Sequence, residues 1–138
     1  MSIIIFITIL AVLIFVHELG HFIVAKKFGI KVDEFAIGFP PMIWSFKRGE
    51  TTYALNAIPF GGYVKIFGEN PDEQSISGPN SNRSFVNASR WKQASVLVSG
   101  ILFNVLFAWI LLSASFMSGL TTSVNESFAS YVKDSHII

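Results

Sequence analysis

Residues 3–25 read IIIFITILAVLIFVHELGHFIVA, an almost continuous run of apolar side chains. At about 1.5 Å per residue this stretch forms a helix of about 34 Å, long enough for a hydrocarbon core of about 30 Å. A secretory signal peptide is the alternative, but no Lys or Arg precedes the run and no small-residue cleavage site follows it closely. The stretch therefore predicts a transmembrane helix.

A second apolar stretch, residues 94–120, contains no charged residue and follows Trp91 and Lys92, a pair of the kind that anchors a helix at the lipid headgroups. The composition agrees, because 51% of the 138 residues are hydrophobic, 14% are charged, and the mean hydropathy is +0.55. The sequence therefore predicts a mainly α-helical membrane protein with two transmembrane helices.

Charge and cysteine content exclude several classes of function. Ten Lys and Arg residues against nine Asp and Glu leave a net charge of +1, so no basic excess indicates a nucleic-acid partner. The chain has no Cys, which excludes disulfides, thiol nucleophiles and Cys-based metal sites. Any metal ion would therefore be bound by His, Asp or Glu.

The positions of the basic residues predict an orientation in the membrane. Nine of the ten lie between the two spans, in residues 26–93, and the remaining one is Lys133. Loops rich in Lys and Arg stay on the cytoplasmic side. We therefore expect a cytoplasmic loop and extracytoplasmic termini.

The loop changes from helical to extended patterning. Runs of β-branched and aromatic residues, punctuated by Gly and Pro, predict strands at 32–37, 43–46, 51–57 and 63–67, with a tight turn at Lys47-Arg48-Gly49-Glu50. The many apolar side chains predict that this hairpin dips into the membrane or lies against it. We assign 1–25 and 94–120 to the transmembrane helices, 26–67 to a membrane-associated β-loop, 68–93 to a flexible cytoplasmic connector, and 121–138 to the start of an extracytoplasmic region.

His17-Glu18-Leu19-Gly20-His21 is an HExxH pattern inside the first predicted helix. Residues four apart share a helix face, so both imidazoles can reach one zinc ion, while Glu18 reaches a water on the metal from the side. Zinc lowers the pKa of that water toward about 7, and the carboxylate takes its proton and passes it to the leaving amine. The pattern indicates metal-assisted hydrolysis, and a chance match on a polar stripe is the alternative.

The membrane setting favours a metal site. Counted back from Lys26, His21 lies about 7 Å and His17 about 13 Å along the helix axis, within hydrocarbon depth. Each charged group near the bilayer centre costs about 2.5 to 3.5 kcal/mol unless a partner satisfies it. A bound metal ion provides that partner for the histidines.

A catalytic zinc normally takes three protein ligands, and only two are visible in this sequence. The remaining His and acidic residues lie in the loop, in the connector or beyond the second span, so we expect the third ligand beyond Ile138 and an inactive protein without it. The apolar pair at the end of the chain looks like the start of a further element, as in a fragment. The candidates considered, all poorly placed, are Asp33, Glu34, Glu50, Asp72, Glu73, Asp134 and His136.

In the second span, Gly100 and Asn104 lie four apart on one helix face, with Ser99 beside them. Small residues let another helix approach closely, and an Asn in hydrocarbon needs a partner for its amide. Gly100 and Asn104 either belong to the candidate metal site or only pack two helices together.

Four motifs follow one another along the chain: HELGH at 17–21, FAIGF at 35–39, IPFGGYVK at 58–65, and Gly100-x-x-x-Asn104. Together, over about residues 5 to 118, the chain resembles the site-2 protease family of intramembrane zinc metalloproteases, most closely its bacterial regulator-of-sigma-E protease type. The resemblance implies Zn2+ as cofactor and a bacterial inner membrane location. It implies that His17 and His21 are zinc ligands and that Glu18 is the catalytic base.

The resemblance also implies that Gly38 and Phe39 belong to a β-loop that binds substrate, and that Asn104 lies near the substrate. The family's third zinc ligand is an Asp in a later transmembrane segment, and its PDZ domain follows the second span. This chain departs from the family at Pro40, where a second Gly is common, and at Ile101, where Gly-Pro is usual. Pro40 removes a backbone donor and limits strand pairing there.

We therefore expect the N-terminal part of an intramembrane zinc metalloprotease that cleaves single-span membrane proteins, such as anti-sigma factors or remnant signal peptides. Its partners would be a transmembrane protein substrate, held extended by an edge strand from residues 35–46, and the lipid bilayer, without nucleic acid. The alternatives are a truncated non-catalytic membrane protein, a helix-packing scaffold, or a zinc transporter, although a transporter normally needs more acidic residues in the membrane. The oligomeric state stays open.

Overall fold

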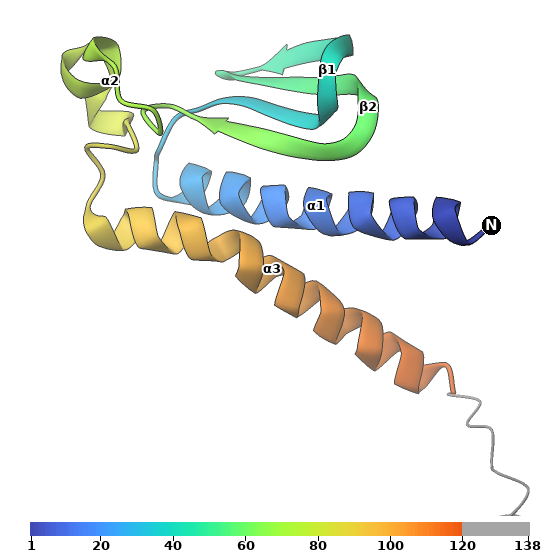
Figure 1. Cartoon of the computed structure of the whole chain (residues 1–138). Coiled ribbons are helices and arrows are strands. Elements are labelled where there is room, and N and C mark those ends of the chain that lie inside the picture. The colour runs from blue at the N-terminus through green and yellow to red at the C-terminus, as the bar shows by residue number, and fades with distance from the viewer. Residues whose placement is uncertain (120–138) are drawn as a thin grey trace, which may run out of the picture. The chain divides into compact units, whose positions relative to one another are not determined.

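The computed structural model describes residues 1–119. In chain order it contains α1 (Ser2–Lys27), β1 (Val32–Arg48), β2 (Thr51–Ile66), α2 (Glu73–Ser77), the 3-10 helix η1 (Ser81–Arg83) and α3 (Arg90–Met117) (Figure 1). The predicted fold class, a mainly helical chain with two long apolar helices and a β-hairpin between them, is confirmed. The assignment of 121–138 lies outside the described residues. Residues 1–107 form one compact unit, and α3 continues beyond it.

Both long helices expose their apolar side chains. Only 6% of the most apolar 18-residue window of α1 is buried within the protein, and 17% of that of α3. Ile4 and Ile101, for example, are 68% and 62% exposed. Helices that are apolar on all sides yet uncovered by protein match a lipid environment, and both are long enough to cross a membrane.

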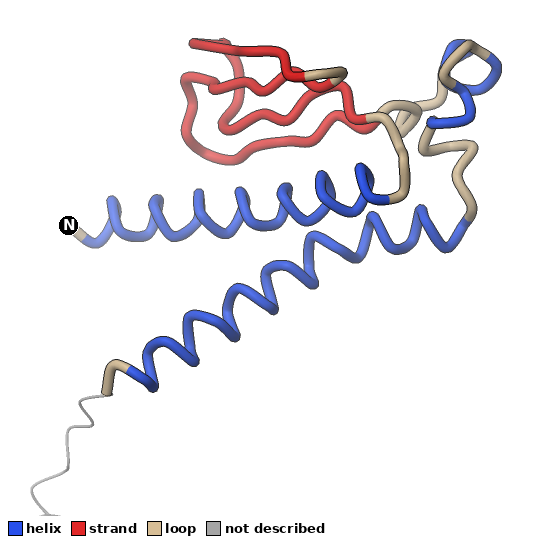
Figure 2. Tube along the Cα trace, turned by 180° about the vertical axis from the view of Figure 1, so that it is seen from behind, coloured by secondary structure: helices blue, strands red, loops and turns tan. Residues whose placement is uncertain are grey.

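β1 and β2 form one antiparallel sheet whose long strands fold back on themselves (Figure 2). Residues 34–37 of β1 pair with 52–55 of β2 on one side and with 62–65 on the other, so they occupy the middle of the sheet. The predicted turn is confirmed, since Gly49 has φ +64° between the two strands. The four strands predicted from the sequence are joined into two: β1 continues through Pro40-Pro41, with an irregular ladder between Ile37 and Trp44, and β2 continues from Thr51 to Ile66.

The sheet packs along α1, and a small apolar core joins the two. Ala25 of α1, Val32 of β1, Ile66 of β2 and Val96 of α3 are buried together with Ile30. This core lies beside the HExxH segment, so it fixes the end of α1, the outer part of β2 and the first turns of α3 relative to one another.

The segment predicted as a flexible connector contains ordered structure. Asp72 and Ser75 form a capping box at the start of α2, and Asn87 donates hydrogen bonds to the carbonyls of Ser75, Ile76 and Ser81. The Asn, Ser and Asp residues that suggested disorder instead satisfy backbone groups at helix ends and turns. Composition alone does not distinguish these two uses.

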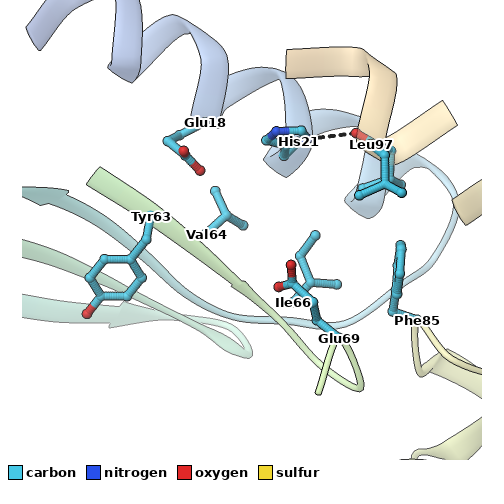
Figure 3. Close-up of a pocket in the computed structure, with 9 residues that line it drawn as sticks. Glu18, His21, Tyr63, Val64, Ile66, Glu69, Phe85 and Leu97 are labelled. Carbon is cyan, nitrogen blue, oxygen red and sulfur yellow. Dashed lines mark hydrogen bonds between the residues drawn. The ribbon is translucent and has the colours of Figure 1, made fainter. Parts of the chain in front are cut away.

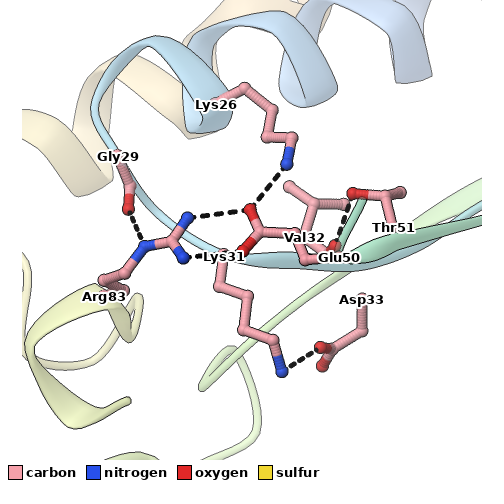
Figure 4. A network of polar contacts seen from close by, with 8 residues as sticks. All are labelled: Lys26, Gly29, Lys31, Val32, Asp33, Glu50, Thr51 and Arg83. Atoms are coloured by element: carbon pink, nitrogen blue, oxygen red, sulfur yellow. Dashed lines mark hydrogen bonds and ion pairs between the residues drawn. The ribbon is translucent and has the colours of Figure 1, made fainter. Parts of the chain in front are cut away.

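A cluster of ion pairs around Glu50 holds the hairpin turn against the end of α1 (Figure 4). Glu50 accepts a hydrogen bond of 2.6 Å from Lys26 and two bonds, of 2.6 and 2.8 Å, from Arg83. Arg83 also donates to the carbonyl of Gly29. Hydrogen bonds from Arg83 and then Lys26 lower the pKa of Glu50 from 4.5 to about 2.

We expect Glu50→Gln to destabilise this region by about 1 kcal/mol, because the side chains in the cluster are partly exposed and water screens the ion pairs. Since the pKa of Glu50 is lowered on folding, the cluster should stabilise fully above about pH 4.5 and lose its effect as the pH falls toward 2. Thermal unfolding in detergent at pH 7 and pH 3 measures both effects. Asp33→Asn, which removes the single Lys31 ion pair, is the control, and an equal loss in both variants contradicts the prediction.

Candidate metal centre

The two histidines of the HExxH segment face one another. His17 and His21 lie one helical turn apart on α1, with their Nε2 atoms 3.1 Å apart. The ring planes are inclined at 82°. The helical spacing therefore brings together the two nitrogen atoms that the sequence predicts as metal ligands.

The backbone of α3 orients the His21 ring. Nδ1 of His21 lies 2.7 Å from the carbonyl oxygen of Val96 (Figure 3). A carbonyl only accepts hydrogen bonds, so Nδ1 carries the hydrogen, and the neutral ring keeps a lone pair on Nε2. A metal-binding imidazole is typically held in this way, with its second nitrogen donating to a backbone carbonyl.

The side chain of Asn104 lies beside the other histidine. Its Nδ2 is 3.5 Å from Nδ1 of His17, and its Oδ1 is buried without a hydrogen-bond partner among residues 1–119. An amide NH2 group only donates, so in this arrangement Nδ1 of His17 accepts and Nε2 carries the hydrogen toward His21. The three contacts thus form one continuous chain, from Asn104 through both rings to the carbonyl of Val96.

Gly100 makes room for both imidazoles. A Cβ atom at this position would lie 2.5 Å from Nε2 of His21 and 2.6 Å from Nε2 of His17. On the opposing helix, a Cβ at Gly20 would lie 2.7 Å from the carbonyl oxygen of Ser99. The two glycines therefore permit a close approach of α1 and α3 at the histidine pair.

The donor atoms fit a zinc ion. With Zn–N bonds of 2.0–2.1 Å, two ligands of a tetrahedral site lie about 3.3 Å apart, close to the 3.1 Å between the Nε2 atoms. His21 already presents a lone pair there, and His17 presents one when its hydrogen is on Nδ1. Imidazole nitrogen is a favoured ligand of zinc.

Glu18 lies at a pocket between α1, β2 and α3 (Figure 3). The pocket has a volume of about 340 Å³, and Glu18 and His21 share its lining with residues from all three elements. Val64 of β2 lies near the Glu18 carboxylate at this pocket. Glu18 therefore lies beside an accessible space that also reaches one of the two histidines. The other lining residues are Tyr63, Val64, Ile66, Glu69, Phe85, Val96 and Leu97.

Tyr63, although it lines the pocket, directs its hydroxyl away from Glu18 (Figure 3). The hydroxyl donates a 2.8 Å hydrogen bond to Glu34. Burial raises the pKa of Tyr63, and the hydrogen bond to Glu34 raises it further, so the phenol stays protonated at neutral pH. The Tyr63 hydroxyl therefore binds a residue of the sheet and not a histidine.

Within residues 1–119 no group of three His, Asp or Glu side chains is placed to hold a metal ion. Glu50 and Asp33 are held in ion pairs with cationic side chains, and Glu34 accepts from Tyr63. The expectation that the third ligand lies beyond Ile138 stays a prediction. Asp134 and His136 lie outside the described residues.

The two predicted substrate-binding residues of the hairpin lie apart from the Glu18 pocket. Gly38 has φ +81°, and a Cβ there would lie 2.6 Å from the carbonyl of Ile58, so the sheet itself requires a glycine. Phe39 is 46% exposed. Neither lines the pocket with Glu18 and His21, and their role in binding substrate stays a prediction.

The sequence did not reveal two contributors to the centre. Val64 brings the outer part of β2 to Glu18, and the Val96 carbonyl orients His21. No motif marks a backbone group, but Val96, Gly100 and Asn104 follow one another at intervals of four on α3. Extending the Gly100–Asn104 face by one turn could have identified Val96.

Comparison with known families matches residues 5–137 to peptidase family M50. The chain belongs to peptidase family M50. Among curated relatives, a Nostoc sp. protein is 42% identical over 83% of this chain and 31% of its own length. A Helicobacter pylori protein is 47% identical over 72% of the chain and 29% of its own length, and one from Bartonella henselae is 39% identical over 90% and 36%.

Each of these three relatives carries the name "Putative zinc metalloprotease". The chain spans about a third of their length, and the family match over residues 5–137 includes the HExxH motif. For an M50 chain, zinc is thus the metal that both the family and the pair of Nε2 atoms indicate.

Proposed function

We propose that this chain forms the zinc-binding part of an intramembrane metalloprotease that hydrolyses peptide bonds in single-span membrane proteins. The observation that carries the proposal is the 3.1 Å approach of the His17 and His21 Nε2 atoms on a helix long enough to cross a membrane, with Glu18 beside them at a pocket. Within family M50, the motif order favours the regulator-of-sigma-E protease type, whose substrates would be anti-sigma factors or remnant signal peptides.

The residues divide the chemistry between them. His17 and His21 would hold the zinc ion, which supplies the positive charge that polarises the scissile carbonyl and acidifies water. Glu18 accepts a proton from the attacking water and passes it to the leaving amine nitrogen as the C–N bond breaks. A third ligand is needed from outside residues 1–119, since a catalytic zinc takes three protein ligands.

The substrate would bind in an extended form. A helical substrate hides its carbonyls in hydrogen bonds, so the scissile region must unwind and needs new partners for its backbone. Within the edge strand expected at 35–46, residues 35–37 are paired on both sides and are not free to bind it, whereas residues 44–46 pair on one side only. Residues 62–66 also pair on one side only, and Val64 among them lines the pocket with Glu18, so we place the substrate along this edge of β2.

The orientation follows from the charges. Lys26, Lys27 and Lys31 at the end of α1, and Arg90 and Lys92 at the start of α3, would lie at the cytoplasmic surface. The pocket beside Glu18 would then open toward the cytoplasm, which can supply water to the reaction. Both the end of α3 and the beginning of α1 would lie on the opposite side of the membrane.

Zinc content tests the proposal. We expect the complete protein, purified in detergent, to bind zinc in one-to-one stoichiometry and to lose it in both His17→Ala and His21→Ala. Thr8→Ala is the control, because Thr8 is on the same helix and its hydroxyl, among the residues that the structure describes, bonds only the carbonyl of Ile4. Folded wild-type protein without zinc would contradict the proposal and would favour the helix-packing scaffold, to which Gly20 and Gly100 are also suited.

A further inference from the structure

The hydrogen bonds give His21 the tautomer that a zinc ligand needs, but they give His17 the other tautomer. The carbonyl of Val96 fixes His21 in the tautomer with a lone pair on Nε2. His17, in contrast, accepts a hydrogen bond at Nδ1 from the Asn104 amide, so the hydrogen of the His17 ring is on Nε2. Zinc binds an imidazole nitrogen only when that nitrogen is unprotonated. To bind a metal, His17 must change tautomer, and its partner at Nδ1 must change from a donor to an acceptor.

The side-chain amide of Asn104 contains both a hydrogen-bond donor, the NH2 group, and an acceptor, Oδ1. Its NH2 end lies 3.5 Å from Nδ1 of His17, and its Oδ1 is a buried acceptor without a partner among the described residues. A buried polar atom without a hydrogen bond costs about 1–3 kcal/mol. Rotation of the amide by half a turn exchanges the two ends, so that Oδ1 accepts a hydrogen from Nδ1 and the NH2 group is freed.

We propose that Asn104 is a positioning residue that serves both tautomers of His17, donating to Nδ1 in one and accepting from Nδ1–H in the other. In the second arrangement, the Nε2 lone pairs of His17 and His21 both face the metal position. The proton moves from Nε2 to Nδ1 of the same ring, so the imidazole stays neutral throughout. This inference rests on the proposed function for its zinc ligand, but the tautomer itself is observable without metal.

Two substitutions separate this role from simple helix packing. Asn104→Asp places an acceptor at His17 in every rotamer that keeps the contact, so it should favour the hydrogen on Nδ1. Asn104→Leu has similar volume and can neither donate nor accept. Ser113→Leu is the matched control, because Ser113 lies on the same helix and, within residues 1–119, its hydroxyl bonds only the carbonyl of Trp109.

The first measurement is the nitrogen NMR spectrum of the complete, zinc-depleted protein labelled with 15N-histidine, at a pH where imidazole is neutral. The His17 signals are assigned by their loss in His17→Ala. In the wild type we expect the hydrogen mainly on Nε2, in Asn104→Asp mainly on Nδ1, and in Asn104→Leu a mixture. A His17 tautomer that is the same in all three proteins would overturn the proposal.

The second measurement is zinc affinity by competition with a chromogenic chelator. Asn104→Leu should bind zinc about 10 to 100 times more weakly, as is typical when the hydrogen-bond partner of a ligand is removed. Asn104→Asp should bind at least as tightly as wild type, and Ser113→Leu should not change. Equal weakening in the Asp and Leu variants would indicate packing only and overturn the proposal. If the wild type binds no zinc, the proposed function fails, while the tautomer comparison still decides the role of Asn104.

Discussion

Glu18→Gln should reduce peptide-bond cleavage by the complete protein to background while leaving its zinc content close to wild type. The amide is nearly the same size as the carboxylate but cannot accept the proton of the attacking water. Proton transfer by a positioned side chain contributes about 10²–10⁴-fold to the rate, and at least this much should be lost. Zinc should remain because His17 and His21, and not Glu18, present the Nε2 pair.

The measurement is cleavage of a single-span reporter in detergent or liposomes, together with metal analysis of the same preparation. Glu73→Gln is the matched control, since Glu73 lies on the exposed α2 helix and does not line the pocket of Glu18. Wild-type turnover by Glu18→Gln would remove this residue from the mechanism. Loss of zinc along with activity would instead make Glu18 part of the metal site.

Gly100→Ala should have the second large effect, although the substitution adds only a methyl group. In most helices the change stabilises by roughly 1 kcal/mol, because glycine is a poor helix former. Here the new Cβ would lie 2.5 Å from Nε2 of His21 and 2.6 Å from that of His17, which is nearly 1 Å inside van der Waals contact. Since a displacement of about 1 Å can lower a rate by 10²-fold, the clash should outweigh the gain in helix propensity.

We expect Gly100→Ala to express as a folded membrane protein with zinc affinity reduced at least tenfold and activity reduced about 100-fold. Val98→Ile is the control, because it adds one carbon to a side chain on the same helix that is 58% exposed. Chelator competition and reporter cleavage give the two readouts. Zinc affinity equal to that of wild type would show that the histidines do not need the space at Gly100.

Local patterns in the sequence were sufficient to predict the helices and the histidine pair. The span at 3–25 is a continuous apolar run, and His17 and His21 meet because residues four apart share a helix face. The turn at Gly49 could be predicted because the turn requires a positive φ, which glycine adopts without strain. Each of these depends on neighbours within a few residues, so one sequence carries enough information.

Features that depend on distant contacts could not be predicted. The middle position of residues 34–37 results from pairing with two separate parts of β2, and short runs of similar hydrophobicity do not specify which strand becomes the edge. The approach of Val64 to Glu18 likewise follows from packing of β2 on α1. The Asn, Ser and Asp residues of 68–87 satisfy backbone groups in α2 and η1, a use that composition does not separate from solvation.

The contact between His17 and Asn104 joins residues 87 positions apart, which has a consequence during biosynthesis. At a translation rate of about 5–20 residues per second, roughly 4–17 s separate the synthesis of the two side chains. For most of that interval α1 has been synthesised, but Val96 and Asn104 have not. The nascent protein therefore has both histidines before it has the groups that contact them, and the proposed metal site can form only after α3 has been made.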